Sequence, residues 1–413
     1  MITVAEASER ILRPIEALPP EPVATGNAAG RVLAERVVAP IDSPPWDNSS
    51  MDGYAVRSGD LGALPATLRV VGEVAAGSFP SRALAAGEAM KVMTGAPVPD
   101  GADSVIRRED TDDGRDVVLI RDFRDARKNI RRQGEDFSAG DVLFDKGEVI
   151  SVAHLGAIAS AGIKSLSLHR QPVVALISSG DELIELDDFN AESVGRRIVS
   201  SNSLTLASLV REAGAIPRDL GIAADSPSSL RGKLESAGDA DLIITSAGIS
   251  VGDHDHVRDV FAELGGELDF WKVRMRPGAP LAFGMLNGKP WIGLSGNPVS
   301  AIVTFELFVR PVIRKMLGFT ALFRQTFPVK IGERITLAAP LMHFLRVIVT
   351  QTSEVNRVAR LAGSQSSAVL TAMARANALL ILPGDRLVVD EGEIHRAMPL
   401  GNSSELSDKL VLA

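Results

Sequence analysis

Cysteine is absent from the 413-residue sequence, and tyrosine occurs only once. Without cysteine there are no disulfides and no thiolate metal ligands, so zinc sites of the cysteine type are excluded. The sequence contains no run of about 18 uncharged apolar residues, and its first residues lack a basic segment followed by an apolar stretch. We therefore expect no membrane-spanning helix, no secretory leader and a cytoplasmic location.

Positive charge is also in deficit, because the formal net charge is −8. A broad footprint on nucleic acid or on an anionic membrane requires clustered Lys and Arg. The one basic cluster runs from Arg121 to Arg132 and is interrupted by Asp122 and Asp125. We interpret it as a solvated face, with an anion-attracting rim as the alternative. The sequence thus predicts neither a nucleic-acid partner nor a membrane partner.

The length predicts roughly two to four domains at about 100–200 residues each. The apolar spacing predicts a helix from Val4 to Leu18, ended by Pro19-Pro20, and a second helix from Ala28 to Val37. Short apolar stretches between Trp46 and about Asp145, separated by Gly, Pro and Asp, predict a β-rich module. We place an N-terminal linker and helical domain at residues 1–45 and 140–171, an inserted β-rich domain at 46–139, an α/β domain at 172–321 and a β domain at 322–413.

From Pro172 onwards, apolar runs alternate with amphipathic segments. Residues 172–177 and 241–245 are short and continuously apolar, as in strands of a parallel sheet that is covered on both faces. Helical spacing follows at residues 206–213, with Ser201 or Asn202 as the cap, and at 257–264. The predicted fold class is therefore multidomain α/β plus β-rich modules, with a central doubly wound α/β domain and a small C-terminal β domain.

A further helix is predicted at the end of the α/β domain. Asn297 is a good N-cap and Pro298 suits the first helical position, so the helix should run towards Leu317 with a kink at Pro311.

Two glycine-containing loops, Ser246–Gly252 and Leu294–Ser300, each follow a predicted strand and precede a predicted helix. At this edge of an open sheet, helix N-terminal amides attract phosphate, so the pair predicts cradles for a pyrophosphate-bearing ligand. Glycine turns without a ligand are the alternative. In the N-terminal half, residues 44–55 predict an ordered loop that presents polar and aromatic groups, with a turn around a packed Trp46 as the alternative.

Six segments occur in one order along the chain. They are Pro44–Ala55, Met93–Pro99, Arg131–Asp136, Ser178–Leu183, Thr245–Gly252 and Gly293–Ser300. At these residues the chain resembles the molybdopterin molybdenumtransferases, the MoeA family that includes the E domain of gephyrin. The resemblance implies a MogA-like molybdopterin-binding α/β domain and an enzyme that inserts molybdate into adenylylated molybdopterin with release of AMP.

The resemblance also implies which residues form the site. The catalytic residues would be Asp52, Thr94, Asp136, Glu182 and Asp255. Residues that bind adenylylated molybdopterin or molybdate would be Ser250, Gly252, Arg276, Gly296, Asn297, Ser300 and Arg346. A magnesium ion would be held by Asp52, Asp136 and Glu182, because carboxylates without thiolates favour a hard cation.

Other polar residues carry weaker predictions. Asp225 matches the family's acidic positions only approximately, and surface solvation or helix capping is favoured for it. His254 and His256 flank Asp255, but adjacent helical residues point in different directions, so we interpret both as surface residues rather than metal ligands.

The chain departs from the family's usual motifs at the expected oxyanion site. Where the family has Lys-Pro-Gly-Lys-Pro, this chain has Arg276 and Ala279 in place of the two lysines. Loss of a cation weakens oxyanion binding, so the alternative function is a molybdopterin-binding carrier or sensor with weakened metal insertion. Ala247 and Ser295 replace a glycine and a proline, and both replacements look tolerable. Ser364 or Ser366 would accompany Arg346.

The resemblance implies a homodimer in which the Asp52 loop faces the α/β domain of the partner. Molybdopterin adenylyltransferase and molybdoenzyme maturation proteins are further expected partners. A gephyrin-like scaffold is the remaining alternative, although nothing fused to this chain supports it.

Overall fold

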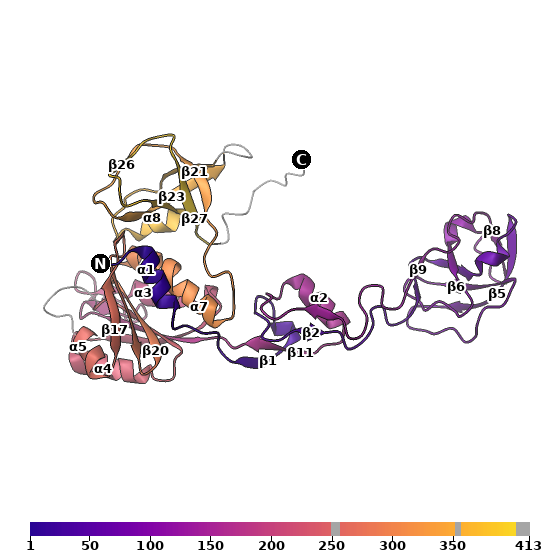
Figure 1. Cartoon of the computed structure of the whole chain (residues 1–413), viewed down its shortest axis with the longest axis horizontal. Coiled ribbons are helices and arrows are strands. Elements are labelled where there is room, and N and C mark those ends of the chain that lie inside the picture. Colours follow the sequence, from indigo (N-terminus) through magenta and orange to yellow (C-terminus); the bar gives the residue numbers. More distant parts are fainter. Residues whose placement is uncertain (249–256, 352–356, 402–413) are drawn as a thin grey trace. The chain divides into compact units, whose positions relative to one another are not determined.

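A computed structural model describes residues 1–248, 257–351 and 357–401. The chain divides into two compact units (Figure 1). The first unit comprises Met1–Glu21 and His169–Ala413, and the second comprises Pro22–Leu168. No helix in the described ranges is long and apolar enough to cross a membrane.

A six-stranded sheet forms the centre of the first unit, and its order is β15-β12-β16-β20-β19-β17. The strands are β12 (Val173–Ser179), β15 (Ile216–Ala223), β16 (Leu242–Ser246), β17 (Glu267–Lys272), β19 (Pro280–Leu286) and β20 (Lys289–Leu294). The first four strands in this order are parallel, and β19 runs antiparallel to both of its neighbours, β20 and β17. Both apolar runs predicted as parallel strands are confirmed as β12 and β16.

Helices cover both faces of this sheet, which explains why its strands are apolar throughout (Figure 1). Side chains at alternate positions of β12 enter opposite cores: Val174 lies in one and Ala175 in the other. Residues of α1 (Val4–Leu12), α3 (Ser201–Glu212), α6 (Pro298–Thr304) and α7 (Arg310–Met316) line the first core. Residues of α4 (Pro227–Ser236) and α5 (Val257–Glu263) line the second. The doubly wound arrangement is confirmed.

Two predicted helices differ from the structure. The first ends at Leu12 rather than Leu18, because Pro14 has no N–H with which to continue the helical hydrogen bonds. The predicted helix from Ala28 to Val37 is wrong. Gly30 has a left-handed φ of 75°, and Val32 and Leu33 make isolated β-bridges to residues far along the chain instead.

The last helix of the α/β domain is interrupted before its proline. A π-helical turn, Phe305–Val309, separates α6 from α7, and Pro311 follows one residue into α7. A proline removes one hydrogen bond and clashes with the carbonyl four residues earlier, so the widened turn on its N-terminal side accommodates it. The interruption of the helix therefore lies ahead of Pro311, the residue at which the kink was predicted.

A small β domain completes the first unit. Five strands close into a ring because β25 pairs with both β27 and β23. The ring comprises β21 (Phe327–Ile331), β23 (Met342–Gln351), β24 (Arg357–Leu361), β25 (Ala378–Leu382) and β27 (Ile394–Pro399). Outside it lie the pair β22 (Ile335–Thr336) and β26 (Val388–Val389), and helix α8 (Leu370–Arg375). The predicted C-terminal β domain is confirmed.

One short strand of the α/β domain pairs with the closed ring of five strands, which we call the barrel. Strand β18 (Met275–Arg276) pairs in parallel with β23, so that Arg276 lies opposite His343. The apolar core of the α/β domain also extends to barrel residues Phe344 and Leu379. The two domains are thus joined by strand pairing and by a shared core.

The second unit contains a five-stranded sheet of order β7-β4-β6-β5-β8. Its strands are β4 (Gly53–Val56), β5 (Ala66–Val74), β6 (Glu88–Val92), β7 (Ser104–Arg107) and β8 (Val117–Ile120). The unit also contains three separate strand pairs, formed by β1 (Pro20–Ala24) with β11 (Ser165–His169), β2 (Val37–Val38) with β10 (Val142–Phe144), and β3 (Asn48–Ser49) with β9 (Ile130–Arg131). The remaining helical elements are α2 (Val152–Ser160), η1 (Thr25–Asn27), η2 (Ser58–Asp60) and η3 (Arg108–Asp110). The predicted β-rich module is confirmed.

Candidate functional site

A cavity of about 580 Å³ lies at the carboxyl ends of the parallel strands in the first unit. Its walls come from the segments around Ser179, Ser200, Ala247 and Gly296, together with Pro280 and Ala368. This is the edge at which open α/β sheets bind ligands, and the volume falls within the range of about 300–1,000 Å³ for small-molecule sites. The cavity therefore lies where the two glycine-containing loops predicted a ligand.

The loops after β16 and β20 touch each other at the cavity because their strands are neighbours in the sheet. The Ala247 N–H donates to the Leu294 carbonyl at 3.0 Å. A Cβ on Gly296 would lie 3.0 Å from the Ala247 Cβ, so the glycine permits this approach. Ala247 has a left-handed φ of 77°, a conformation that costs a non-glycine residue about 1–2 kcal/mol. The replacement that looked tolerable from sequence therefore carries backbone strain.

The ligand-binding residues predicted on these loops have different positions. Gly296 and Asn297 line the cavity. Ser300, in the first turn of α6, is buried and does not line it. Ser250 and Gly252 lie outside the described residues, as does Asp255.

Glu182 is the one charged side chain among the described residues that line the cavity. It precedes β13 (Leu183–Ile184), and its carbonyl accepts a hydrogen bond from Ile198 at 2.8 Å, beside β14 (Ile198–Val199). A Cβ on Gly180 would lie 2.6 Å from Glu182 Oε2, so the carboxylate folds back over this glycine. The prediction that Glu182 lies at the ligand edge of the sheet is consistent with this position.

Asp225 links two loops of the sheet edge rather than facing the cavity. Its carboxylate accepts from the Ser179 hydroxyl at 3.2 Å, and its own N–H donates to Asp181 at 3.0 Å. The helix that follows is capped by Ser226, whose hydroxyl accepts from Ser229. Of the two roles favoured for Asp225, helix capping thus belongs to its neighbour, whereas Asp225 itself is exposed, as surface solvation predicted.

Arg346 lies fully buried on β23, with no exposed surface. Its Nη2 donates to the carbonyls of Ser364 and Ser366, at 3.1 and 3.0 Å. Its Nε and Nη1 have no hydrogen-bond partner among residues 1–248, 257–351 and 357–401. Burial lowers the pKa of Arg346 from its ordinary value. A buried guanidinium with unused donors is costly, so this geometry favours an anionic ligand.

Arg276 lies on β18, the short strand of the α/β domain that pairs with β23 of the C-terminal β domain. We call this pairing the seam between the two domains. The Arg276 side chain is exposed. The turn that follows packs closely on α6: a Cβ on Gly278 would lie 2.5 Å from Thr304 Cγ2. The two arginines expected to contact an oxyanion are therefore carried by neighbouring strands of one sheet.

In the second unit, Asp52 and Thr94 are in direct contact. The backbone N–H and the hydroxyl of Thr94 each donate to Asp52 Oδ1 at 2.7 Å. The backbone hydrogen bond from Thr94 is the main cause that lowers the pKa of Asp52, followed by the hydroxyl, with a smaller effect from the charge of Arg108. Both are exposed, so the pair presents an ionised carboxylate at the surface.

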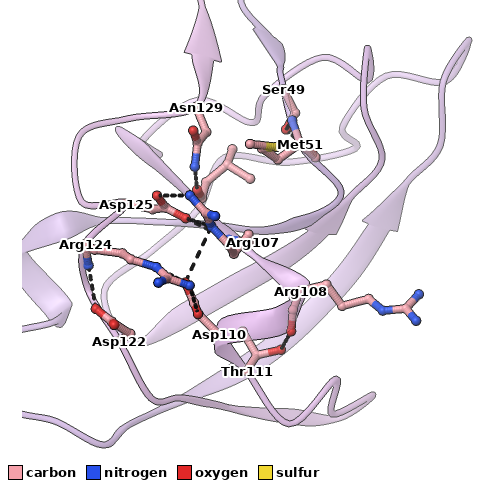
Figure 2. A network of polar contacts seen from close by, with 11 residues as sticks. Ser49, Met51, Arg107, Arg108, Asp110, Thr111, Asp122, Arg124, Asp125 and Asn129 are labelled. Atoms are coloured by element: carbon pink, nitrogen blue, oxygen red, sulfur yellow. Dashed lines mark hydrogen bonds and ion pairs between the residues drawn. The ribbon is translucent and has the colours of Figure 1, made fainter.

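A network of acidic and basic side chains surrounds Arg107, the residue before Arg108 (Figure 2). Buried Asp125 accepts from Arg107 Nε at 2.7 Å and from Nη2 at 3.0 Å, which lowers the pKa of Asp125. Asp110 accepts from Arg124 Nε at 2.8 Å. Next to Arg107 in the sequence, the Arg108 N–H donates to the Asp52 carbonyl at 3.1 Å, which connects the network to Asp52. Sequence reasoning missed this network, and it treated Arg124 as part of a solvated face.

The segment from Pro44 to Ala55 is more regular than predicted. It contributes β3 and begins β4, where a Cβ on Gly53 would lie 2.0 Å from the Ile106 carbonyl. Only glycine permits this close strand contact. Tyr54 is fully buried, and its hydroxyl bonds to Asp113 and to the Gly114 carbonyl. Burial raises the pKa of Tyr54 to about 12. Its predicted exposure to a ligand is wrong.

Asp136 lies exposed in the second unit, in a loop held against the Asp47 segment. Its N–H donates to the Ser43 carbonyl at 2.9 Å, and Arg132 forms an ion pair with Asp47 at 2.5 Å. Glu182 belongs to the first unit. Among the described residues, no group of three His, Cys, Asp or Glu side chains is placed to hold a metal ion.

Comparison with known proteins places the chain in a family. The MoeA N-terminal region (domain I and II) matches residues 2–162, the probable molybdopterin binding domain matches 175–315, and the MoeA C-terminal region (domain IV) matches 328–400. The chain belongs to the MoeA family. A molybdopterin molybdenumtransferase of Staphylococcus aureus is 34% identical over 391 residues, which cover 93% of this chain and 92% of that protein.

Two further relatives support the assignment. The molybdopterin molybdenumtransferase 2 of Mycobacterium tuberculosis is 36% identical over 403 residues, covering 95% of this chain and 98% of the relative. The crystal structure of a molybdopterin biosynthesis MoeA protein from Pyrococcus horikoshii has a TM-score of 0.81 and 28% identity, covering 97% of this chain and 99% of that one. The MoeA fold thus extends over nearly the whole chain.

Proposed function

We propose that this protein inserts molybdate into adenylylated molybdopterin and releases AMP, as a step of molybdenum cofactor biosynthesis. The observation that carries this proposal is the buried guanidinium of Arg346, which has two unused donor atoms and lies on β23, the strand whose start pairs with β18 and Arg276. Family membership supplies the reaction class, and these two arginines would supply positive charge for an oxyanion substrate.

The cavity at the sheet edge would hold adenylylated molybdopterin. Backbone groups of the loops around Ala247 and Gly296 face it, and Asn297 precedes α6. These uncharged groups can donate hydrogen bonds to phosphate and heterocycle oxygens without a charged side chain. In this proposal Ser250, Gly252 and Ser300 complete the ligand contacts, as the family resemblance implies.

Arg346 and Arg276 would bind molybdate close to this cavity. Ala368, which lines the cavity, and Ser366, whose carbonyl accepts from Arg346, belong to the same loop before α8. The loop also contacts the start of α6, because Val299 N–H donates to the Ser367 carbonyl at 3.2 Å. The two dithiolene sulfurs would then replace an oxo group of molybdate, which leaves as water, and one water would cleave the phosphoanhydride to release AMP and leave the terminal phosphate on molybdopterin.

The carboxylates Asp52, Asp136, Glu182 and Asp255 would form the charged side of the site with Thr94. Their oxygen atoms suit magnesium, which in proteins is usually shared between one or two carboxylates and substrate phosphates. When bound, the ion would neutralise charge on the phosphoanhydride as that bond breaks. Thr94 would keep Asp52 ionised and oriented by its two hydrogen bonds. The homodimer, the cytoplasmic location and the protein partners expected from the resemblance belong to this proposal.

The test is a single-turnover measurement of AMP release from adenylylated molybdopterin at increasing molybdate. Arg346→Gln should raise the molybdate concentration needed for half-maximal release by roughly 10- to 100-fold, since a charged hydrogen bond contributes about 1.5–3 kcal/mol. Arg360→Gln is the matched control, because this exposed arginine lies on β24 of the same barrel. Equal molybdate dependence of Arg346→Gln and the wild type would show that Arg346 does not bind the oxyanion.

A carrier or sensor function is favoured by one observation, the absence of the family's second cation at Ala279. A wild-type protein that binds adenylylated molybdopterin but releases no AMP with molybdate would support that function over the transferase.

A further inference from the structure

Asn202 connects the two loops that form the cavity. It lies in the first turn of α3, two positions beyond the Ser200 N-cap, so its predicted capping role is wrong. Its Nδ2 donates to Ser246 Oγ at 2.7 Å and to the Gly296 carbonyl at 3.0 Å. A carboxamide nitrogen carries two hydrogens, so these two bonds use both of them. Because a carbonyl can only accept, the nitrogen rather than the oxygen of Asn202 must face Gly296.

This geometry fixes how Ser246 can act. Ser246 lines the cavity at the end of β16 and is only 3% exposed. Its oxygen accepts from Asn202, so its own O–H remains to be donated elsewhere. The hydrogen bonds among the described residues give this O–H no acceptor. A buried donor without a partner is unfavourable, so a ligand atom in the cavity is the natural acceptor.

The other side chains that line the cavity support a ligand oxygen as that acceptor. Apart from Glu182, every described side chain in the lining is uncharged. A ligand oxygen there must therefore find its donors among hydroxyls, amides and backbone N–H groups. A donor fixed in direction by a second residue loses less entropy on binding than a freely rotating hydroxyl.

We propose that Ser246 donates its hydroxyl hydrogen to an oxygen atom of the ligand, and that Asn202 is the positioning residue that directs this hydroxyl into the cavity. The inference rests on the proposed function, because the ligand is taken to be adenylylated molybdopterin. The acceptor is a phosphate oxygen of the adenylyl half or a carbonyl oxygen of the pterin half.

The test is a double-mutant cycle read by calorimetric affinity for adenylylated molybdopterin. Ser246→Ala should weaken binding by about 3- to 10-fold, the usual effect of one uncharged hydrogen bond. Asn202→Asp places a carboxylate beside Ser246, which accepts the hydroxyl hydrogen and withdraws it from the ligand. In that background Ser246→Ala should change affinity by less than about 2-fold, because coupled residues are not additive.

AMP provides the second ligand. If Ser246→Ala lowers the affinity for both AMP and the whole substrate, the acceptor belongs to the adenylyl half. A loss for the whole substrate alone assigns it to the pterin half. Ser203→Ala is the matched control: Ser203 is also buried and follows Asn202, but its hydroxyl bonds to Ser178 and Ser200 and does not line the cavity. Its affinity should match the wild type.

Three outcomes would overturn the inference. The first is unchanged affinity in Ser246→Ala, and the second is an equal loss in Ser203→Ala. The third is a full Ser246→Ala effect retained in the Asn202→Asp background. Fluorescence of buried Trp291 reports whether Asn202→Asp folds. If it does not fold, the affinities of Ser246→Ala and Ser203→Ala still test whether the Ser246 hydroxyl contacts the ligand. A wild-type protein that binds no adenylylated molybdopterin would refute the proposed function itself, whereas normal wild-type binding with silent variants refutes only this inference.

Discussion

The backbone N–H and the hydroxyl of Thr94 donate to the same oxygen, Oδ1 of Asp52. Hydrogen bonds to the charged form of a carboxylate stabilise that form, so the pKa of Asp52 lies below its ordinary value. A residue on one segment thus sets both the charge and the direction of a carboxylate 42 positions away.

Thr94→Val should raise the pKa of Asp52 part of the way towards its ordinary value, because the hydroxyl bond is lost and the stronger backbone bond stays. Thr94→Ser, which keeps both donors, should leave it unchanged. Carboxyl chemical shifts followed by NMR titration would measure this. Because the folded pKa is lowered, the stabilisation is present above the unfolded pKa and is lost as pH falls through the folded pKa. An unshifted titration in Thr94→Val would contradict the role of the hydroxyl.

Ala279→Lys should lower the molybdate concentration for half-maximal AMP release by about 10-fold, because a charged hydrogen bond contributes about 1.5 kcal/mol or more. Ala279 is half-buried beside the Arg276 turn, so a lysine can extend from there. Ala279→Gln, similar in length but uncharged, is the control and should have little effect. Arg276→Ala should nearly abolish molybdate use. If Ala279→Lys and Arg276→Ala are both silent, the oxyanion is bound elsewhere.

Ala247→Gly should raise the free energy of unfolding by roughly 0.5–1 kcal/mol, because glycine adopts the left-handed backbone without strain but loses more chain entropy. Gly248→Ala should act in the opposite sense. It adds a Cβ at φ 72° that would lie 2.5 Å from Val257 Cγ2. Denaturant unfolding followed by Trp291 fluorescence would compare the two variants. A loss of stability in Ala247→Gly would show that the alanine methyl packs favourably.

Glu306→Gln should destabilise the first unit by about 3 kcal/mol at neutral pH, since removing one partner of a buried ion pair leaves the other charge uncompensated. Glu306 accepts from Arg310 Nε at 2.7 Å and from Arg324 Nε at 2.8 Å. Burial alone would raise the pKa of Glu306, but the hydrogen bonds and charges of both arginines outweigh it and lower the pKa.

The pH dependence of this variant follows from that shift. The stabilisation by Glu306 is present above its unfolded pKa and is lost as pH falls through its lowered folded pKa. The difference between wild type and Glu306→Gln should therefore be largest at neutral pH and should shrink in acid. Glu9→Gln breaks only an exposed pair with Arg13 and should have almost no effect at any pH. A difference that grows in acid would contradict the assignment.

The sequence predicted correctly the strands that are buried on both faces. It failed for segments whose structure depends on pairing with residues far along the chain. The strands β12 and β16 were predictable because both faces are covered, which leaves a continuous apolar run. The helix expected from Ala28 to Val37 failed because its apolar residues pair with segments more than 100 positions away, such as Val149 and Leu168. Local spacing carries no information about such partners.

The candidate site shows the same division. The cavity edge could be predicted from strand, glycine and helix order alone. The oxyanion residues depended on family resemblance, because nothing local distinguishes Arg346 from other strand arginines. Asn202 looked like a helix cap, since its partners Ser246 and Gly296 lie 44 and 94 positions along the chain.

If the oxyanion binds as proposed, the pairing of β18 with β23 would link ligand binding thermodynamically to domain association. An oxyanion that contacts both Arg276 and Arg346 would bind across this seam, and it would therefore favour the paired state by the same factor by which pairing favours its binding. Saturating molybdate would then stabilise the barrel against separation from the α/β domain. A substitution in the barrel, remote from both arginines, would then change oxyanion affinity if it weakened the pairing of Met275 and Arg276 with β23.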